Sequence, residues 1–231
     1  MLVLLPPSEG KEAPRRGKPL DLAALAYAEA LAAPRAAVLD AVGPALREAP
    51  TAAAMKVYTG VLFQAVRLPE LPGPARRRVL IFSGLWGVVR PGDRIPGYKL
   101  PVGTKLPGLG PLAAHWRGPL RDALPDRGLV VDLRSGPYAA MWSPRRAKVV
   151  TVRAFTPDGK VISHMVKATR GRVARVLLEA AAPPRTAEQA LELVLAAGLR
   201  ATLEGGTLDV VEAGPARRAV PGTTAGLDAV G

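Results

Sequence analysis

The side chains of this sequence that are best suited to chemistry are cations and hydroxyls, and they come from widely separated segments. The cations are Lys11, Arg90, Lys99, Lys167, Arg170 and Arg175. The hydroxyls belong to Ser8, Thr59, Tyr98, Ser135 and Tyr138. Arginine offers phosphate a planar fork and lysine offers a point charge, so the set predicts a site for an anion. No general base is obvious in it. Lys11 or Lys167 would serve only if burial among cations lowered its pKa, with Asp93 orienting a partner.

The signatures of common enzymes are absent from the sequence. There is no Walker loop, no G-x-G-x-x-G after a strand, no H-E-x-x-H and no G-x-S-x-G. The lack of cysteine excludes disulfides, thiol nucleophiles and thiolate metal sites. With His115 and His164 as the two histidines, a histidine-rich metal centre is excluded. An iron site would need a carboxylate-histidine cluster, and the acids are scattered. We therefore expect no metal and no cofactor.

The charge of the chain is strongly positive and unevenly distributed. Its 231 residues include 32 lysines and arginines against 19 acids, a formal net charge of +13. Residues 76–105 contain seven basic residues and one acid, and residues 134–175 contain ten and one. A charge of this size implies an anionic partner or a strongly solvated surface. If the two segments meet in the fold, they form one positive surface.

Two short apolar runs predict buried strands that end in polar loops. Leu2 to Leu5 is typical of a strand inside the sheet, and residues 6–11, PPSEGK, follow it. Leu129 to Leu133 is a second such strand, and residues 134–138, RSGPY, follow it. Open α/β sheets bind ligands beyond the carboxyl ends of their strands, so both loops are candidate ligand-binding segments. A solvated turn is the competing interpretation of each.

Residues 79–103 combine a strand-forming run with many glycines and prolines. Glycine opens dihedral space and proline closes it, so the segment predicts a shaped loop system. Its charged residues, Arg90, Asp93, Arg94 and Lys99, are mostly basic, which indicates the lip of an anion site. Upstream, the triplet Tyr58-Thr59-Gly60 precedes a helical run and would place a hydroxyl and a free N–H near an anion, or form a capped loop.

Periodic apolar residues predict several packing helices. Residues 18–46 indicate helices broken at Pro34 and at Gly43-Pro44, and residues 112–124 a helix interrupted at Gly118-Pro119. Further helices are expected within residues 51–67, 165–181 and 186–197. The last of these has a capping box from Thr186 to Gln189 and a stop at Gly198.

The helix expected over residues 165–181 is unusual in its charge. Lys167 and Arg170 share a face near its start, and Arg175 lies about a turn further on. Positive charge at a helix N-terminus opposes the helix dipole. Something other than helix stability must favour these residues there.

The whole pattern predicts one mixed α/β (α+β) domain over residues 1–212, with a mixed sheet flanked by helices. Hairpins are expected from Lys148–Phe155 through a turn to residues 160–163, and from residues 199–203 to 207–211. Residues 213–231 are rich in Gly, Ala and Pro and are expected to be a disordered tail. The first apolar run lacks a preceding basic region and no run is long enough to span a bilayer, so we expect a soluble cytoplasmic protein without a signal peptide.

Spaced matches along residues 1–212 resemble the YaaA peroxide-stress protein family. They are Pro7 and Lys11, Tyr58-Thr59-Gly60, Ser83-Gly84-Leu85-x-Gly87-Val88, Arg90-Pro91-x-Asp93, Tyr98-x-Leu100, Gly103, Trp116, Leu133-x-Ser135, Tyr138, and Lys167-x-x-Arg170-Gly171-x-x-x-Arg175. The resemblance implies a family-specific fold with a helix-hairpin-helix-like element beside a basic cleft. Gly84 and Gly87 are the candidate hairpin backbone, because phosphate-binding hairpins need closely spaced glycines.

The resemblance also implies a function in oxidative stress. Family members are implicated in protection from hydrogen peroxide, in limiting free iron and DNA damage, and the best-described member looks like a DNA-binding protein. The implied anion- or DNA-binding set is Lys11, Tyr58, Thr59, Arg90, Tyr98, Lys99, Ser135, Lys167, Arg170 and Arg175. Few aromatic residues are available as a stacking platform, so we expect recognition of backbone or distorted structure, largely independent of sequence.

The chain departs from the family pattern between Asp132 and Ala140. Where relatives often carry Asn-Leu-Ala-Ser and Glu-Tyr-x-Lys, this chain has Asp132-Leu133-Arg134-Ser135 and Pro137-Tyr138-Ala139-Ala140. The loop lysine is missing, and Arg134 or Arg145 is available to replace its charge. The C-terminal region is also short for the family. A second hypothesis is therefore kept: an enzyme acting on a nucleotide or another small anionic substrate in a deep basic pocket.

Overall fold

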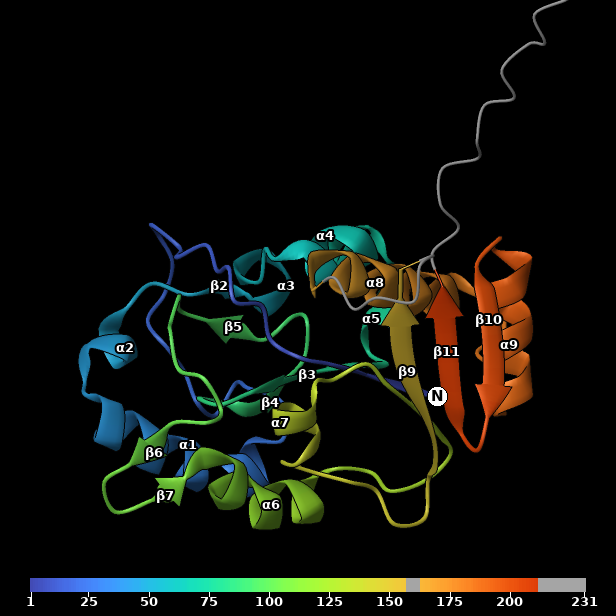
Figure 1. Cartoon of the computed structure of the whole chain (residues 1–231). Coiled ribbons are helices and arrows are strands. Elements are labelled where there is room, and N and C mark those ends of the chain that lie inside the picture. The colour runs from blue at the N-terminus through green and yellow to red at the C-terminus, as the bar shows by residue number, and fades with distance from the viewer. Residues whose placement is uncertain (157–162, 212–231) are drawn as a thin grey trace, which may run out of the picture.

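A seven-stranded sheet organises the computed structural model, which describes residues 1–156 and 163–211 (Figure 1). Its strand order is β10-β11-β9-β8-β1-β3-β4. The strands are β1 (Leu2–Leu5), β3 (Val79–Ser83), β4 (Gly87–Val89), β8 (Leu129–Asp132), β9 (Lys148–Phe155), β10 (Arg200–Glu204) and β11 (Thr207–Val211). The five inner strands pair in parallel, whereas β4 and β10 pair antiparallel at the two edges. The predicted mixed α/β single domain is confirmed.

Strand β1 lies inside the sheet, as its unbroken apolar run predicts. It pairs with β3 on one side and with β8 on the other, and Leu4 stands opposite both Leu80 and Asp132. Val3, Leu4 and Leu5 are fully buried. Both strands on which the predicted ligand-binding loops depend are therefore present and adjacent.

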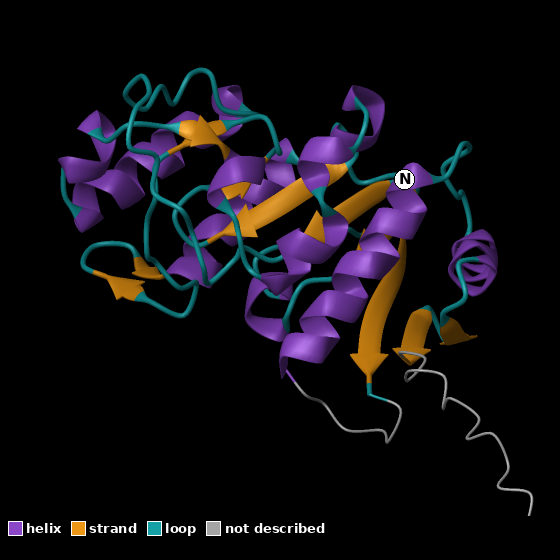
Figure 2. Ribbon diagram, turned by 90° about the horizontal axis from the view of Figure 1, so that it is seen from above, coloured by secondary structure: helices purple, strands orange, loops and turns teal. Residues whose placement is uncertain are grey.

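Helices cover the sheet on both sides. They are α1 (Ala28–Val42), α2 (Ala45–Glu48), α3 (Ala54–Val57), α4 (Val61–Val66), α5 (Gly73–Arg76), α6 (Leu112–Ala123), α7 (Gly136–Ala139), α8 (Ser163–Glu179) and α9 (Ala187–Ala196). A 3₁₀ turn spans Leu68–Glu70. In Figure 1, α4 and α8 lie together above the sheet and α1 packs with α6 below it. In Figure 2, which views the molecule from above, α8 lies in front of the strands.

Two small antiparallel ribbons complete the described fold. Strand β2 (Ala52–Ala53) pairs with β5 (Arg94–Ile95), and β6 (Lys105–Leu106) pairs with β7 (Gly110–Pro111). Both lie on the β4 side of the molecule (Figure 1). Strands β5, β6 and β7 all lie in the long segment between β4 and α6, so the two ribbons hold that segment in place.

The helix expected over residues 18–46 is shorter at its start and continuous where a break was expected. Residues 18–27 are not helical, because Tyr27 adopts left-handed backbone angles (φ 60°) and the Ala26 N–H is bound by the Asp93 carboxylate. Pro34 lies inside α1 without ending it. Its neighbour Arg35 is fully buried and donates hydrogen bonds to three carbonyls outside the helix, so tertiary contacts override the local cost of proline.

The interruption expected at Gly118-Pro119 is also wrong, because α6 runs through both residues. Leu112, Trp116 and Leu120 form its fully buried face. The packing of that face contributes more to the stability of the helix than is lost with the one backbone hydrogen bond that Pro119 cannot donate.

The end of the chain follows the sequence closely where it is described. The hairpin of β10 and β11 is present, with Gly205 and Gly206 at positive φ, and Thr186 caps α9 by accepting a hydrogen bond from the Gln189 N–H. The second strand of the other expected hairpin falls largely on residues 157–162, outside the described residues. β9 itself pairs in parallel with β8 and β11. The expected tail, residues 213–231, also lies outside them. No helix in the described ranges is long and apolar enough to cross a bilayer.

Candidate functional site

The carboxyl ends of β1, β3 and β8 meet at one edge of the sheet, because the three strands are parallel neighbours. Along the chain, β1 is followed in this sheet by β3, which is its neighbour on one side. Strand β8 is the neighbour of β1 on the other side, and it is followed by β9, which lies further out on that side. This reversal between β1 and β8 is a topological switch point, where open α/β sheets bind ligands. We call the residues that gather there the carboxyl-edge site: Glu9, Lys11, Tyr58, Ser83, Tyr98, Asp132, Arg134, Tyr138, Lys167 and Arg170.

Lys11 lies over two tyrosine rings in this site. Its Nζ donates a hydrogen bond of 2.5 Å to the Ser8 carbonyl and lies 4.6 Å from the centre of the Tyr98 ring and 5.7 Å from that of Tyr58. A backbone bridge joins Lys11 to Tyr58. Burial lowers the pKa of the Lys11 amine, and the Glu9 carboxylate opposes that shift. The ammonium is thus held in place by aromatic faces and one carbonyl.

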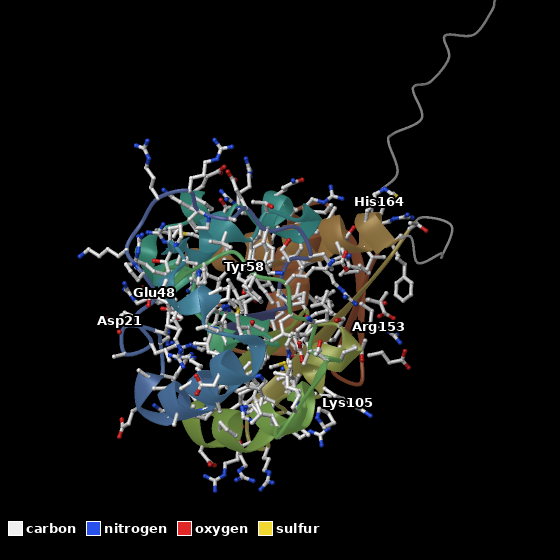
Figure 3. All side chains as sticks on the ribbon, turned by 90° about the vertical axis from the view of Figure 1, so that its left-hand side faces the viewer. Asp21, Glu48, Tyr58, Lys105, Arg153 and His164 are labelled. Atoms are coloured by element: carbon white, nitrogen blue, oxygen red, sulfur yellow. The ribbon has the colours of Figure 1, made fainter. Side chains whose placement is uncertain are left out.

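Under Lys11 runs a chain of three hydroxyls. The Tyr58 and Tyr98 hydroxyls are 2.7 Å apart, and Tyr98 is 2.7 Å from Ser83 Oγ. Ser83 Oγ already accepts the N–H groups of Leu85 and Trp86, so its own hydrogen points toward Tyr98. Burial raises the pKa of both phenols, which keeps them neutral at neutral pH. Figure 3 shows Tyr58 deep among the side chains, so its ring offers no surface for stacking.

Lys167 reaches the same edge from helix α8. Its Nζ lies 3.1 Å from Glu9 Oε1, and the Glu9 side chain is 89% exposed. Burial raises the pKa of the Tyr138 phenol, a hydrogen bond from the Val102 backbone lowers it, and the Glu9 carboxylate adds a smaller upward shift. One exposed carboxylate therefore faces Lys11, Lys167 and Tyr138 together.

Arg170 stands one turn beyond Lys167, near a carboxylate that is already engaged. Asp132 binds Arg134 through two hydrogen bonds, of 2.9 Å to Nε and 2.7 Å to Nη2, and the Arg134 guanidinium lies 4.1 Å from the centre of the Phe82 ring. Burial lowers the pKa of Arg170, and Asp132 opposes that shift. Its Nε is buried without a hydrogen-bond partner in the described ranges. Arg170 is thus a partly desolvated cation, and the Asp132 carboxylate that opposes its pKa shift serves another arginine.

Three other predicted residues lie beside this site. Thr59 follows Tyr58, and its N–H donates to the Gly10 carbonyl, while the next N–H, of Gly60, donates to Ser8 Oγ at 2.6 Å. Ser135 is exposed at the start of α7, and Lys99 is exposed next to Tyr98. The Gly60 N–H that sequence reasoning offered to an anion is therefore bound to a serine.

Gly84 and Gly87 form the tight turn between β3 and β4, so the candidate hairpin joins two strands rather than two helices. A side chain at Gly84 would lie 2.7 Å from the Leu100 carbonyl, and one at Gly87, whose φ is 68°, would lie 2.6 Å from the Trp116 ring. Leu85 and Trp86 between them are fully buried. Close packing explains both glycines, and the N–H groups of the turn are already bonded to Ser83.

Arg90 and Asp93 lie away from the carboxyl-edge site. Strand β4 is antiparallel to β3, so Arg90 emerges at the opposite edge, where it donates to the Arg77 carbonyl at 2.6 Å and to the Tyr27 hydroxyl at 3.1 Å. Asp93 accepts the N–H groups of Ala26 and Arg90, and burial raises its pKa. Asp93 therefore holds backbone N–H groups in place here, and it does not orient Lys11 or Lys167 as the sequence suggested.

Arg175 also has a structural environment. Its Nη1 donates to the carbonyls of Val66 and Arg67 at the end of α4, and its guanidinium contacts Glu70 and Glu179. Gly171 lets α8 approach α4 closely, since a side chain there would lie 2.4 Å from the Leu62 carbonyl. Arg175 therefore fastens the helix that carries Lys167 and Arg170.

The sequence assigns no role to Glu9, Ser83 or Asp132, and it offers Arg134 only as a replacement for the charge of the missing loop lysine, whereas the structure pairs Arg134 with Asp132. The available signal was positional, because Ser83 and Asp132 are polar residues at the last position of apolar strands. Glu9 was visible in its loop without a partner. In the part of the chain that the structure describes, no three His, Asp or Glu side chains are grouped as metal ligands would be.

Comparisons with known proteins give one consistent result. A family model described as peroxide stress protein YaaA matches residues 15–194. A UPF0246 protein of Streptomyces coelicolor is 43% identical over 230 residues, covering 83% of this chain and 88% of the relative. A UPF0246 protein of Corynebacterium efficiens is 36% identical, covering 89% and 96%. An uncharacterized protein of Campylobacter jejuni is 35% identical over about half of each chain, 54% and 53%.

Proposed function

Because the chain belongs to the YaaA peroxide stress protein family, we propose that it binds DNA through the carboxyl-edge site and limits DNA damage driven by free iron during peroxide stress. In this proposal the protein acts without catalysis. It binds the sugar-phosphate backbone or distorted DNA, and bases are not read.

One observation carries the proposal. Lys11, Lys167 and Arg170 come from segments more than 150 residues apart and converge on a switch point, where the Glu9 carboxylate faces the two lysines. The pairing of Asp132 with Arg134 leaves Arg170 available for another anion. Cations held in this way attract phosphate, and the formal net charge of +13 draws a polyanion toward the protein.

The buried tyrosines support recognition that is independent of sequence. Tyr58 is 2% exposed, and Tyr98 bonds Tyr58 and Ser83 rather than presenting its hydroxyl to solvent. The buried Tyr58 ring cannot stack on bases, which is how single-strand binders hold nucleobases, and Lys11 lies over the half-buried Tyr98 ring. Phosphate contacts position a protein on DNA without reading its sequence.

Fluorescence anisotropy at several salt concentrations tests the proposal. Each neutralised phosphate contributes a slope of about −0.9 to the plot of log K against log salt, so three cations predict about −2.7. Lys167→Gln should weaken binding and make the slope shallower by about 0.9. Lys148→Gln is the matched control, because Lys148 is an exposed lysine at the opposite end of the parallel strands. Absence of binding to duplex, bulged and single-stranded DNA at low salt would contradict the proposal.

A specific observation favours the second candidate, an enzyme acting on a nucleotide or small anionic substrate. Burial lowers the pKa of Lys11, and its amine lies over the rings of a hydroxyl chain that ends at Ser83. An amine of lowered pKa beside such a chain suits proton transfer. Incubation with nucleoside mono- and triphosphates followed by ³¹P NMR tests this function. Turnover that Lys11→Gln abolishes would favour the enzyme, whereas DNA binding would fall only modestly in that variant.

A further inference from the structure

We infer that the carboxyl-edge site takes a phosphate monoester, such as the 5′-phosphate at a DNA end, a nick or a free nucleotide, in preference to a phosphodiester within an intact strand. The inference deepens the proposed function and rests on it for the DNA source of that phosphate. It names the chemical group that the three cations are arranged to receive.

Charge is the first support. Arg134 and Asp132 neutralise one another through their paired hydrogen bonds. Lys11, Lys167 and Arg170 are then opposed by Glu9, so these four groups carry a formal excess of two positive charges. A phosphate monoester carries about −1.5 to −2 at neutral pH, whereas each backbone phosphodiester carries one negative charge. The monoester matches the excess.

Burial is the second support. Lys11 and Arg170 are partly buried, and Arg170 Nε is fully buried without a partner in the described ranges. A backbone phosphate is flanked by a sugar on each side, which limits its approach to recessed donors. A terminal phosphate is attached on one side only, so it reaches them with three free oxygens.

The arrangement of donors is the third support. Lys11 uses one N–H on the Ser8 carbonyl and keeps its remaining donors. Lys167 is paired with Glu9, and the partly buried guanidinium of Arg170 lies one turn further along α8. Three donors on separate side chains suit the three oxygens of a monoester, and charge-assisted hydrogen bonds of this kind are the strong ones.

The test compares two nicked duplexes that differ in one group, a 5′-phosphate or a 5′-hydroxyl at the nick, by anisotropy with the full chain at low salt. The phosphorylated nick should bind about tenfold tighter, the ratio expected from one further charge-assisted hydrogen bond. Arg170→Gln should abolish the preference. Arg146→Gln, which makes the same charge change at an exposed residue just before β9, should keep it. Competition by dAMP against adenosine reports the free-nucleotide source.

The outcomes separate the inference from the proposed function. Equal binding of both nicked duplexes, with no competition by dAMP, overturns the inference and leaves DNA binding standing. Binding of dAMP without binding of either duplex supports the monoester and overturns the DNA function. Binding of neither overturns both. If Arg170→Gln lowers the thermal midpoint, Arg170→Lys and Lys167→Gln repeat the comparison; a preference unchanged in both overturns the inference.

Discussion

Two clusters of basic residues in this protein look alike in sequence and differ in what their charges meet. At the β4 flank, made by Arg35 and Arg90 beside Asp93, each guanidinium donates several hydrogen bonds to the fold. Arg35 donates through Nε and Nη2 to the carbonyls of Ala26, Trp86 and Val88, while its Nη1 is buried without a partner in the described ranges, and Arg90 donates to the Arg77 carbonyl and the Tyr27 hydroxyl. At the carboxyl-edge site, Lys11, Lys167 and Arg170 have fewer acceptors. The difference indicates that a structural cation is distinguished from a ligand-binding one by the number of hydrogen-bond acceptors that the fold already gives it. Residue type does not distinguish them.

The largest effect should come from breaking the β4 flank. Arg35→Met leaves three carbonyls without their donor, two of them on residues that are fully buried. We expect a loss of about 3 kcal/mol or more in the free energy of unfolding, measured by urea denaturation. Arg121→Met, at an exposed arginine paired with Asp122, is the control and should change it by less than about 0.5 kcal/mol. An Arg35→Met protein whose free energy of unfolding equals that of the unmodified protein would contradict the distinction between the two clusters.

The next largest effect tests how α8 holds the carboxyl-edge site. In Gly171→Ala the new methyl group would lie 2.4 Å from the Leu62 carbonyl and 2.6 Å from Ala65 Cβ, so α8 must move away from α4. We expect a loss of about 2 kcal/mol by overpacking, together with weaker DNA binding, because Lys167 and Arg170 move with the helix. Gly118→Ala meets no atom within 4 Å and should leave stability unchanged or slightly raised. Equal behaviour of the two variants would contradict the account.

A smaller, pH-dependent effect distinguishes Asp93 from an ordinary surface acid. Burial raises its pKa in the folded protein, so the folded state binds this proton more tightly than the unfolded state. Its contribution to stability is therefore greatest below the unfolded pKa and falls as pH rises through the folded pKa. Asp93→Asn should remove that fall. Urea denaturation of both proteins from acid to neutral pH measures it, and identical pH profiles would refute the assignment.

The smallest effect on stability should come from the carboxyl-edge site itself. Lys167→Gln removes one half-exposed ion pair with Glu9, which is worth less than about 1 kcal/mol. The free energy of unfolding should therefore be nearly unchanged while DNA affinity falls about three- to tenfold. Thermal unfolding and anisotropy on the same sample give both numbers. A large stability loss with unchanged affinity would place Lys167 among the structural cations.

The sequence was sufficient for the strands and for the edge where polar loops gather. Apolar runs at Leu2–Leu5 and Leu129–Asp132 are long enough to identify, and topology then brings their loops together. It was not sufficient for Arg90. Strand β4 turns back antiparallel to β3 and carries Arg90 to the opposite end of the strands, and no local signal in the sequence predicts that reversal. Pro34 misled for a similar reason: a proline signal is local, whereas the buried contacts of Arg35 that hold α1 come from residues far along the chain.

The central claim is that Arg170 meets a phosphate while the arginines of the β4 flank do not. Arginine ¹H–¹⁵Nε NMR tests it directly, with the Arg170 signal identified by its loss in Arg170→Gln. On addition of a 5′-phosphorylated nicked duplex, we predict a large shift of the Arg170 Nε–H signal and none for Arg35 or Arg90. An unchanged Arg170 signal at saturating DNA, or a shift confined to Arg35 and Arg90, would contradict the account.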